Sequence, residues 1–158
     1  MYKILFSTIL ICLSASLFSQ SKKEVKKNKI SSVTVTETNG SKTINDSKTS
    51  YDSNGEEIEK TEYSKDGSLK KTMKYKLNNL GDVVEEEEYD EKNTLKEKTT
   101  IKYNALGDKK EELVYDGANK LLKKHVYTYD NKGLKTERKT LDGSGKLIST
   151  KKYTYTFK

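Results

Sequence analysis

The feature that most constrains this chain is a marker residue that recurs at alternating intervals of 12 and 14 positions. Eight glycines or asparagines carry it: Gly55, Gly67, Gly81, Asn93, Gly107, Asn119, Gly133 and Gly145. A tyrosine or leucine stands four positions before each of them: Tyr51, Tyr63, Leu77, Tyr89, Tyr103, Tyr115, Tyr129 and Leu141. Two successive intervals add up to a repeat of 26 positions (12 + 14), which indicates a tandem array of one small structural unit.

Each marker lies in a polar segment that is typical of a tight turn, such as YDSNGE at residues 51–56. An Asp or Asn at the start of a turn can accept a hydrogen bond from the backbone two residues later. Glycine tolerates a positive φ, and asparagine is its usual substitute. The chain also contains Asn39-Gly40, a strong hairpin signal, and it has no proline to interrupt a ladder of hydrogen bonds.

The segments between the turns read as β-strands of two alternating lengths. The expected long strands are Leu69–Leu77, Leu95–Tyr103, Leu121–Tyr129 and Leu147–Tyr155. The expected short strands are Glu57–Tyr63, Val83–Tyr89, Lys109–Tyr115 and Lys135–Leu141. We therefore predict an all-β fold: an open or curled antiparallel meander of about ten strands, built from tandem hairpins. Residues 31–50 are expected to form a degenerate N-terminal capping hairpin, and residues 51–158 the repeat domain.

Side chains alternate between the two faces of a strand, so position parity predicts the faces. In the long strands the odd positions are partly apolar and rich in tyrosine, whereas the even positions are rich in lysine. The same sorting of the short strands puts Glu86 and Glu88 on the lysine-rich face. It puts one glutamate of every repeat on the other face, where it would pair with Lys71 or Lys123: Glu59, Glu85, Glu111 and Glu137. The tyrosines of the short strands, Tyr63, Tyr89 and Tyr115, would then form a stripe that helps to bury one face.

The N-terminus is predicted to direct export. Residues 1–19 combine a lysine, a short apolar run and small residues, as in a secretory signal peptide cleaved between Ser19 and Gln20; an uncleaved anchor is the alternative. Residues 20–30 are expected to be a solvated basic linker. The net charge is +7, of which +5 lies in residues 1–29, so only +2 (7 − 5) belongs to the rest of the chain. This distribution argues against nucleic-acid binding and indicates a secreted, periplasmic or cell-surface protein.

Apolar residues make up 32 % of the chain, below the 45–50 % that is usual in globular domains. The regular spacing of the tyrosines argues against disorder. The repeat region is therefore expected to fold with a thin core, as a single-layer or loosely wrapped sheet does.

The motif itself resembles a known repeat. The segment YTYDNKGLKTE at Tyr127–Glu137, together with YDSNGE, resembles the tyrosine–aspartate (YD) repeats of Rhs-type proteins and is similar to MORN-like hairpin repeats. The resemblance implies consecutive antiparallel strands in a curling sheet, and roles as extracellular scaffolds, adhesins or toxin casings. This chain has too few repeats to enclose another protein, and no functional residue is carried over from the resemblance.

The sequence offers little for catalysis. Its single histidine, His125, has no cysteine in the mature chain to form a zinc site with it and no partners for a triad. We expect no catalytic residues, no metal and no cofactor. The alternative is a carboxylate-dependent, glycosidase-like hydrolase that uses Glu111 and a second acid in a concave site.

The expected function is therefore non-enzymatic: an exported binding or scaffold module whose partner is an envelope protein or a glycan. The candidate binding residues are the tyrosines of the long strands: Tyr75, Tyr103, Tyr127, Tyr129, Tyr153 and Tyr155. Two alternatives remain open. The tyrosines can be a purely structural stripe, or the protein can be an inhibitor or immunity-like partner that offers a sheet face or edge to another protein.

Overall fold

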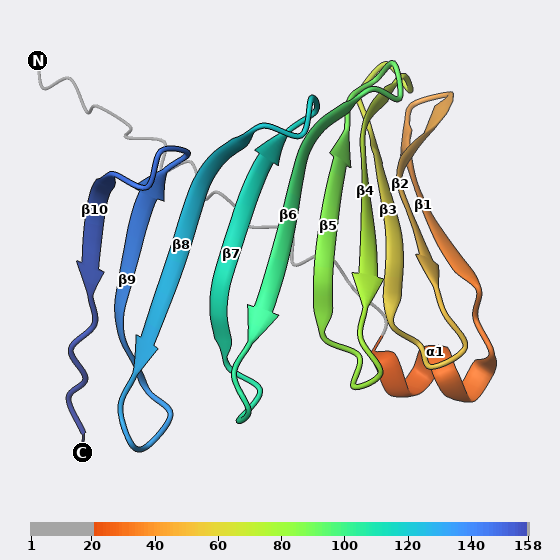
Figure 1. The fold of residues 1–158 in the computed structure, drawn as a ribbon. Helices are drawn as coiled ribbons and strands as arrows, with labels where there is room; N and C mark the ends of the chain where they lie inside the picture. The colour runs from red at the N-terminus through yellow and green to blue at the C-terminus, as the bar shows by residue number, and fades with distance from the viewer. Residues whose placement is uncertain (1–20, 158) are drawn as a thin grey trace, which may run out of the picture.

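The protein forms a single curled β-sheet with one short helix at one end (Figure 1). This computed structural model describes residues 21–157. Ten strands follow one another in the sheet in the order of the sequence, and every neighbouring pair is antiparallel. The predicted all-β meander of tandem hairpins is confirmed. The expected signal peptide lies outside the described residues.

The strand bounds are close to those predicted from the positions of the turns. They are β1 (Ser32–Asn39), β2 (Lys42–Tyr51), β3 (Glu57–Tyr63), β4 (Leu69–Leu77), β5 (Val83–Tyr89), β6 (Leu95–Tyr103), β7 (Lys109–Asp116), β8 (Leu121–Tyr129), β9 (Lys135–Asp142) and β10 (Leu147–Lys152). Strands β7 and β9 extend one position beyond the prediction, and β10 ends at Lys152 instead of Tyr155.

A side-chain cap closes each turn from β2 onward. In the first of these turns, Asp52 Oδ1 accepts hydrogen bonds from the backbone N–H of Asn54 (2.8 Å) and Glu56 (2.9 Å). Gly55 has a φ of +81° and donates its N–H to the Asp52 carbonyl. Seven of the eight turns show this arrangement, and in the eighth the cap is the Asp66 carboxylate. The predicted left-handed conformation of the two asparagine markers is confirmed, since Asn93 and Asn119 have φ values of +57° and +64°.

Every one of these hairpins also contains a β-bulge next to the turn. In the β4–β5 hairpin, Lys76 lies opposite Glu85 and Leu77 lies opposite Val83, so Val84 has no residue opposite it. The other seven hairpins show the same shift of register. A bulge inserts one residue into one strand, and it therefore reverses the relation between position parity and sheet face.

The bulges overturn the predicted faces of the short strands. Glu86 and Glu88 lie opposite Tyr75 and Met73, on the tyrosine face. The repeated glutamates Glu59, Glu85, Glu111 and Glu137 lie on the lysine face instead, and their partners are not Lys71 or Lys123. The tyrosines of the short strands are on this face too: Lys74 Nζ lies 4.7 Å from the centroid of the Tyr89 ring.

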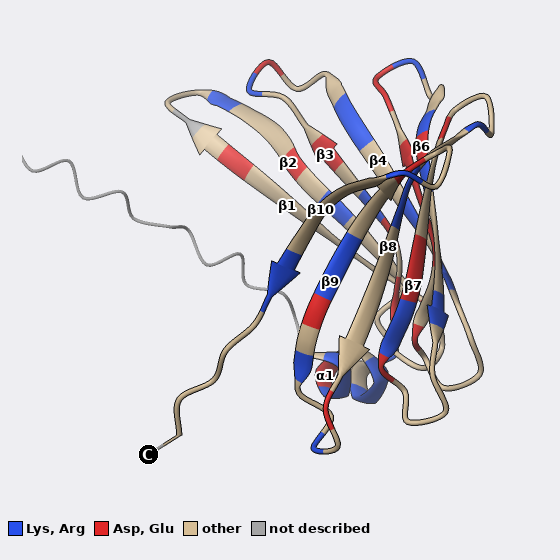
Figure 2. Ribbon diagram, turned by 60° about the vertical axis from the view of Figure 1, so that its left-hand side comes forward, with Lys and Arg blue, Asp and Glu red and all other residues tan. Residues whose placement is uncertain are grey.

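The sheet curls because successive repeats are displaced along the strands. Glu59 of β3 lies opposite Lys74 of β4, and Lys74 lies opposite Glu87 of β5. Residues at the same level of two strands that are one repeat apart, here Glu59 and Glu87, therefore differ by 28 positions (87 − 59). The sequence repeat spans only 26 positions (81 − 55), so each repeat is offset by two positions from the one before it. Such a stagger tilts the strands and curls the sheet, and Figure 2 shows the curled sheet. We call the tyrosine side of the sheet the inner face and the lysine side the outer face.

The inner face is the better buried of the two, although no second layer covers it in the described part of the chain. Ile101, in the middle of this face, is only 4 % exposed. Apart from Ile101, Val25 is the only buried apolar side chain among the described residues. The expectation of a thin core therefore agrees with the structure.

The expected linker contains a helix, α1 (Lys22–Asn28), at the end of the sheet near the β2–β3 turn (Figure 1). Ser21 and Glu24 form a capping box, and Val25 is 1 % exposed. The helix backbone approaches Gly55 so closely that a Cβ there would lie 2.7 Å from the Lys22 carbonyl oxygen. The sequence signal was present as the S-x-x-E motif, which predicts a helix start.

We predict that Gly117→Ala destabilises the sheet, whereas Glu91→Ala, at the equivalent position one repeat earlier, does not. A Cβ on Gly117 would overlap the carbonyl oxygen of Leu95 in the adjacent hairpin. The expected loss is about 1–3 kcal/mol of unfolding free energy, against less than about 0.5 kcal/mol for exposed Glu91. Urea unfolding of both variants measures the difference, and equal losses would contradict the close approach.

Candidate functional site

The six candidate tyrosines all lie on the inner face or on its continuation past β10, but they divide into two rows. Three of them hold neighbouring segments together. The hydroxyl groups of Tyr103, Tyr129 and Tyr155 donate to the carbonyl oxygens of Val83, Lys109 and Lys135, each at 2.8 Å. In each case the acceptor lies 20 residues earlier in the chain. We call these three the bracing tyrosines, because their polar ends are already used within the sheet.

The second row, which we call the central row, consists of Tyr75, Tyr127 and Tyr153, with Ile101 at the remaining position of this repeating series. The hydroxyl of Tyr127 donates to the Glu112 carboxylate, which also accepts from Lys109 Nζ at 2.9 Å. Tyr153 is 36 % exposed, so part of this residue is open to solvent.

Lys135 connects two tyrosines of the central row. Its Nζ lies 4.7 Å from the ring centroid of Tyr127 and 5.6 Å from that of Tyr153. A cation in this position is attracted to the faces of both rings. The two aromatic rings and the ammonium group therefore form one cluster that joins β8, β9 and the segment after β10.

Burial controls the ionisation of this face. Burial raises the pKa of Tyr75 to about 12, and Glu57, Glu86 and Glu62 contribute to the increase. Burial and the hydrogen bond to Glu112 raise the pKa of Tyr127 as well. Both phenols are therefore neutral hydrogen-bond donors well above neutral pH.

The other polar groups of this cluster have defined ionisation states. Burial raises the pKa of Glu112, but the hydrogen bonds from Tyr127 and Lys109 outweigh it, so the pKa is lowered. Burial, together with the nearby Arg138 cation, lowers the pKa of His125, whose Nδ1 lies 3.0 Å from Thr140 Oγ1. The result is an ionised glutamate next to a neutral imidazole. This arrangement supports a structural role for His125.

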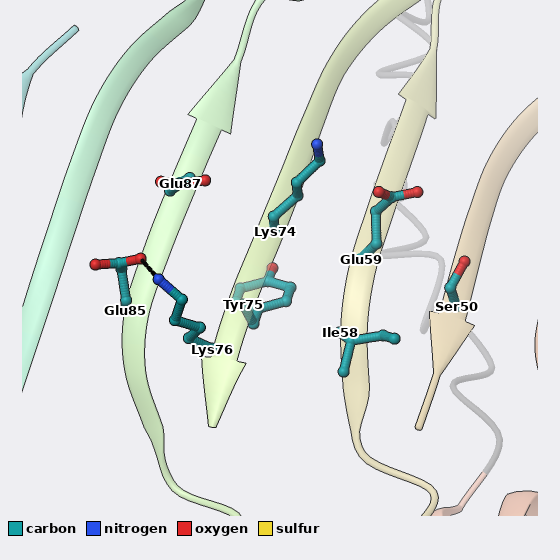
Figure 3. Close-up of a pocket in the computed structure, with 8 residues that line it drawn as sticks. All are labelled: Ser50, Ile58, Glu59, Lys74, Tyr75, Lys76, Glu85 and Glu87. Carbon is teal, nitrogen blue, oxygen red and sulfur yellow. Dashed lines mark hydrogen bonds and ion pairs between the residues drawn. The ribbon is translucent and has the colours of Figure 1, made fainter. Parts of the chain in front are cut away.

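The outer face has a shallow groove of about 450 Å³ over β2–β5 (Figure 3). Its lining includes Glu59, Glu85 and Glu87 together with Lys74 and Lys76. The ion pair between Lys76 Nζ and Glu85 Oε1, at 2.7 Å, lies in its wall. The groove therefore presents three carboxylates and two ammonium groups, of which one pair is already joined.

The same ion pair returns one repeat later and involves the residue on which the hydrolase hypothesis depends. Glu111 accepts from Lys102 at 3.2 Å and also pairs with Lys124. The hydrogen bond from Lys124 is the largest cause of the lowered pKa of Glu111. A general acid needs a raised pKa and a concave site, whereas Glu111 stands between two lysines on the outer face. The geometry favours a structural ion pair.

Residues 21–157 give no support for a metal site or for a helix that crosses a membrane. No group of three His, Cys, Asp or Glu side chains in this region is arranged to hold a metal ion. No helix here combines the length and apolar character needed to cross a membrane.

Position parity within the long strands is enough to place the candidate tyrosines on one face. It puts some of the side chains around them on the opposite face. Glu112 and Arg138 belong to short strands, and the bulges move these even positions to the inner face. The signal that could have located them is the turn itself, since a left-handed residue after a tight turn is typical of a hairpin with a bulge.

Comparison with known proteins identifies no family for this chain. No protein-family model matches it, and no curated protein matches it. Similar solved structures include TarM (16 % identity, TM-score 0.33), where the match covers 80 % of this chain and 22 % of TarM. They also include a Bacteroides fragilis protein of unknown function (17 %, TM-score 0.43, covering 80 % and 96 %) and a porin-like protein from Bacteroides uniformis (9 %, TM-score 0.32, covering 69 % of each chain). These likenesses are too low to carry a functional argument.

We predict that the stability of the protein falls as the pH rises from about 10 to about 12. In the unfolded chain tyrosine ionises near pH 10, whereas in the folded chain the Tyr75 pKa is about 12. The unfolded state therefore loses its protons first, and the stabilisation is lost as the pH rises through this window.

Unfolding by urea at a series of alkaline pH values measures this loss. The double variant Tyr75→Phe, Tyr127→Phe should show a flatter profile than the wild type. A profile that is equally steep in both proteins would show that the central row does not carry the effect.

Proposed function

We propose that this protein is an exported, non-enzymatic binding or scaffold module of the periplasm or cell surface, and that its inner face contacts the ligand. The observation that carries the proposal is the central row of tyrosines on a curled sheet that no second layer covers within residues 21–157. An apolar patch that stays open to solvent often marks a binding site, and Tyr153, at the end of this row, is 36 % exposed.

The chemistry of the cluster suits a ligand with both polar and apolar surface. Tyrosine presents an apolar ring face together with a polar hydroxyl, and it is enriched at binding interfaces for this reason. At Tyr127 and Tyr153, Lys135 adds a positive charge between the two rings. Sugar rings and polar protein surfaces both match such a site, so an envelope glycan or an envelope protein is the expected partner.

The division of the tyrosines into two rows defines which side chains are available for binding. The bracing tyrosines have their hydroxyl groups bound to backbone carbonyls, so their replacement would damage the sheet as well as any binding. Tyr153 and Tyr127 present ring surface beside Lys135, and the Tyr127 hydroxyl is bound to the Glu112 side chain instead of to a backbone carbonyl. These two residues are therefore the informative positions for mutation.

We predict that Tyr127→Ala combined with Tyr153→Ala reduces partner capture by at least about tenfold, since buried aromatic contacts often dominate an interface. The test is a pull-down from the envelope of the producing cell with residues 20–158 as bait. The matched control is Tyr89→Ala with Tyr115→Ala, which removes two rings from the outer face.

Circular dichroism establishes that both double variants keep their β-structure. Loss of capture in the inner-face variant alone would support the proposal. Unchanged capture by a folded inner-face variant would remove the tyrosine face from consideration. Equal losses in the two variants would point to a general effect on the sheet.

A further inference from the structure

The outer edge of β10 is unlike the rest of the sheet. Every residue of β10 is exposed, and among the described residues this strand pairs only with β9. Half of the ten exposed large apolar side chains lie in the short segment 147–157, with exposures from 36 % to 69 %: Leu147, Ile148, Tyr153, Tyr155 and Phe157. This concentration marks the edge as a candidate docking surface.

The backbone N–H and C=O groups along this edge point in directions that suit pairing with an added strand. Tyr153 donates its N–H to the Thr136 carbonyl of β9 at 3.0 Å, so the Tyr153 N–H faces inward along the sheet. Backbone polar groups alternate in direction along an antiparallel strand. Thr150 and Lys152 therefore direct their N–H and C=O groups away from β9, where an added strand would meet them.

The sheet itself contains a template for that added strand. Lys151 and Lys152 follow Met73 and Lys74 by 78 positions (152 − 74), which is three times the repeat of 26. On β4 these two positions lie opposite Glu88 and Glu87 of β5. Within residues 21–157, neither Lys151 nor Lys152 has an ion-pair partner.

From this correspondence we infer that the β10 edge binds an acidic, extended segment of a partner protein, which joins the sheet as an antiparallel strand beside β10. The glutamates or aspartates of that segment lie opposite Lys151 and Lys152, as Glu88 and Glu87 lie opposite Met73 and Lys74. Strand addition of this kind takes its affinity from main-chain hydrogen bonds and its specificity from alternate side chains.

Charge complementarity decides between this partner and a second copy of the chain. Antiparallel pairing of two β10 strands would bring the lysines of both copies together, and like charges in cross-strand pairs are destabilising. The other edge strand, β1, contains one acidic residue, Glu37, and does not reproduce the acidic run of β5. The inference concerns the sheet edge and does not require the ligand site proposed on the inner face.

The probe for this surface is a fluorescent peptide with the sequence of residues 82–90, DVVEEEEYD, which contains β5. Fluorescence anisotropy at low salt should show binding to the full-length protein. A peptide with its four glutamates replaced by glutamine should bind at least about tenfold more weakly, because two cross-strand charge pairs are lost.

Two protein variants locate the site. Lys151→Glu with Lys152→Glu reverses the charges of the edge, and Thr150→Pro removes an outward N–H but none that faces β9. Each should weaken binding at least about tenfold. The matched control, Lys92→Glu with Lys120→Glu, changes the net charge equally at two exposed hairpin turns and should bind as the wild type does.

Circular dichroism and urea unfolding establish whether the variants are folded. If Thr150→Pro is not folded, peptide binding by the variant Lys151→Glu with Lys152→Glu decides the test. Failure of the wild type to bind the peptide, or equal binding by the edge variants and the control, would overturn the inference. A dimer of the wild type that Thr150→Pro dissociates would also overturn it, because a second copy would then occupy the edge.

Discussion

The capped turn is the interaction on which the whole sheet depends. An Asp or Asn side chain accepts two backbone N–H groups, and a left-handed Gly or Asn returns the chain toward the previous strand, as at Asp52 and Gly55. This geometry introduces a bulge into every repeat hairpin, so the turn also determines which side chains reach which face. The alternating spacing of the turns then displaces each repeat along the strands and curls the sheet.

With so little apolar burial, the two faces stabilise the sheet by different means. On the outer face, cross-strand pairs such as Lys76–Glu85 and Lys102–Glu111 contribute roughly 0.2–1 kcal/mol each. On the inner face, the bracing tyrosines connect neighbouring segments through their hydroxyl groups, and the ladders of backbone hydrogen bonds do the rest. In the central row the Tyr127 hydroxyl also connects two strands through Glu112, so our assignment of this row to binding rests on the ring surface of Tyr127 and Tyr153 beside Lys135.

The turn residues predicted the fold well and the faces only in part. Gly, Asn and Asp report directly on backbone conformation, so the strand bounds and the left-handed asparagines followed from the sequence. The bulge residues, such as Val84, have no distinctive side chain, and counting parity across them put Glu85 and Glu86 on the wrong faces. The same error hid Glu112 and Arg138 from the candidate site. Helix α1 was readable from Ser21 and Glu24, but the density of lysines around them favours a linker when the sequence is read alone.

The most direct test of this account is disulfide trapping across β4 and β5, in a chain whose Cys12 is replaced by serine. The bulge places Lys74 and Glu87 opposite each other on one face, at a spacing that suits a disulfide. Lys74→Cys with Glu87→Cys should therefore oxidise readily, whereas Lys74→Cys with Glu86→Cys should stay reduced because those side chains point to opposite faces. Rapid oxidation of the second pair and not the first would contradict the bulged register, and with it the assignment of every side chain to the inner or outer face.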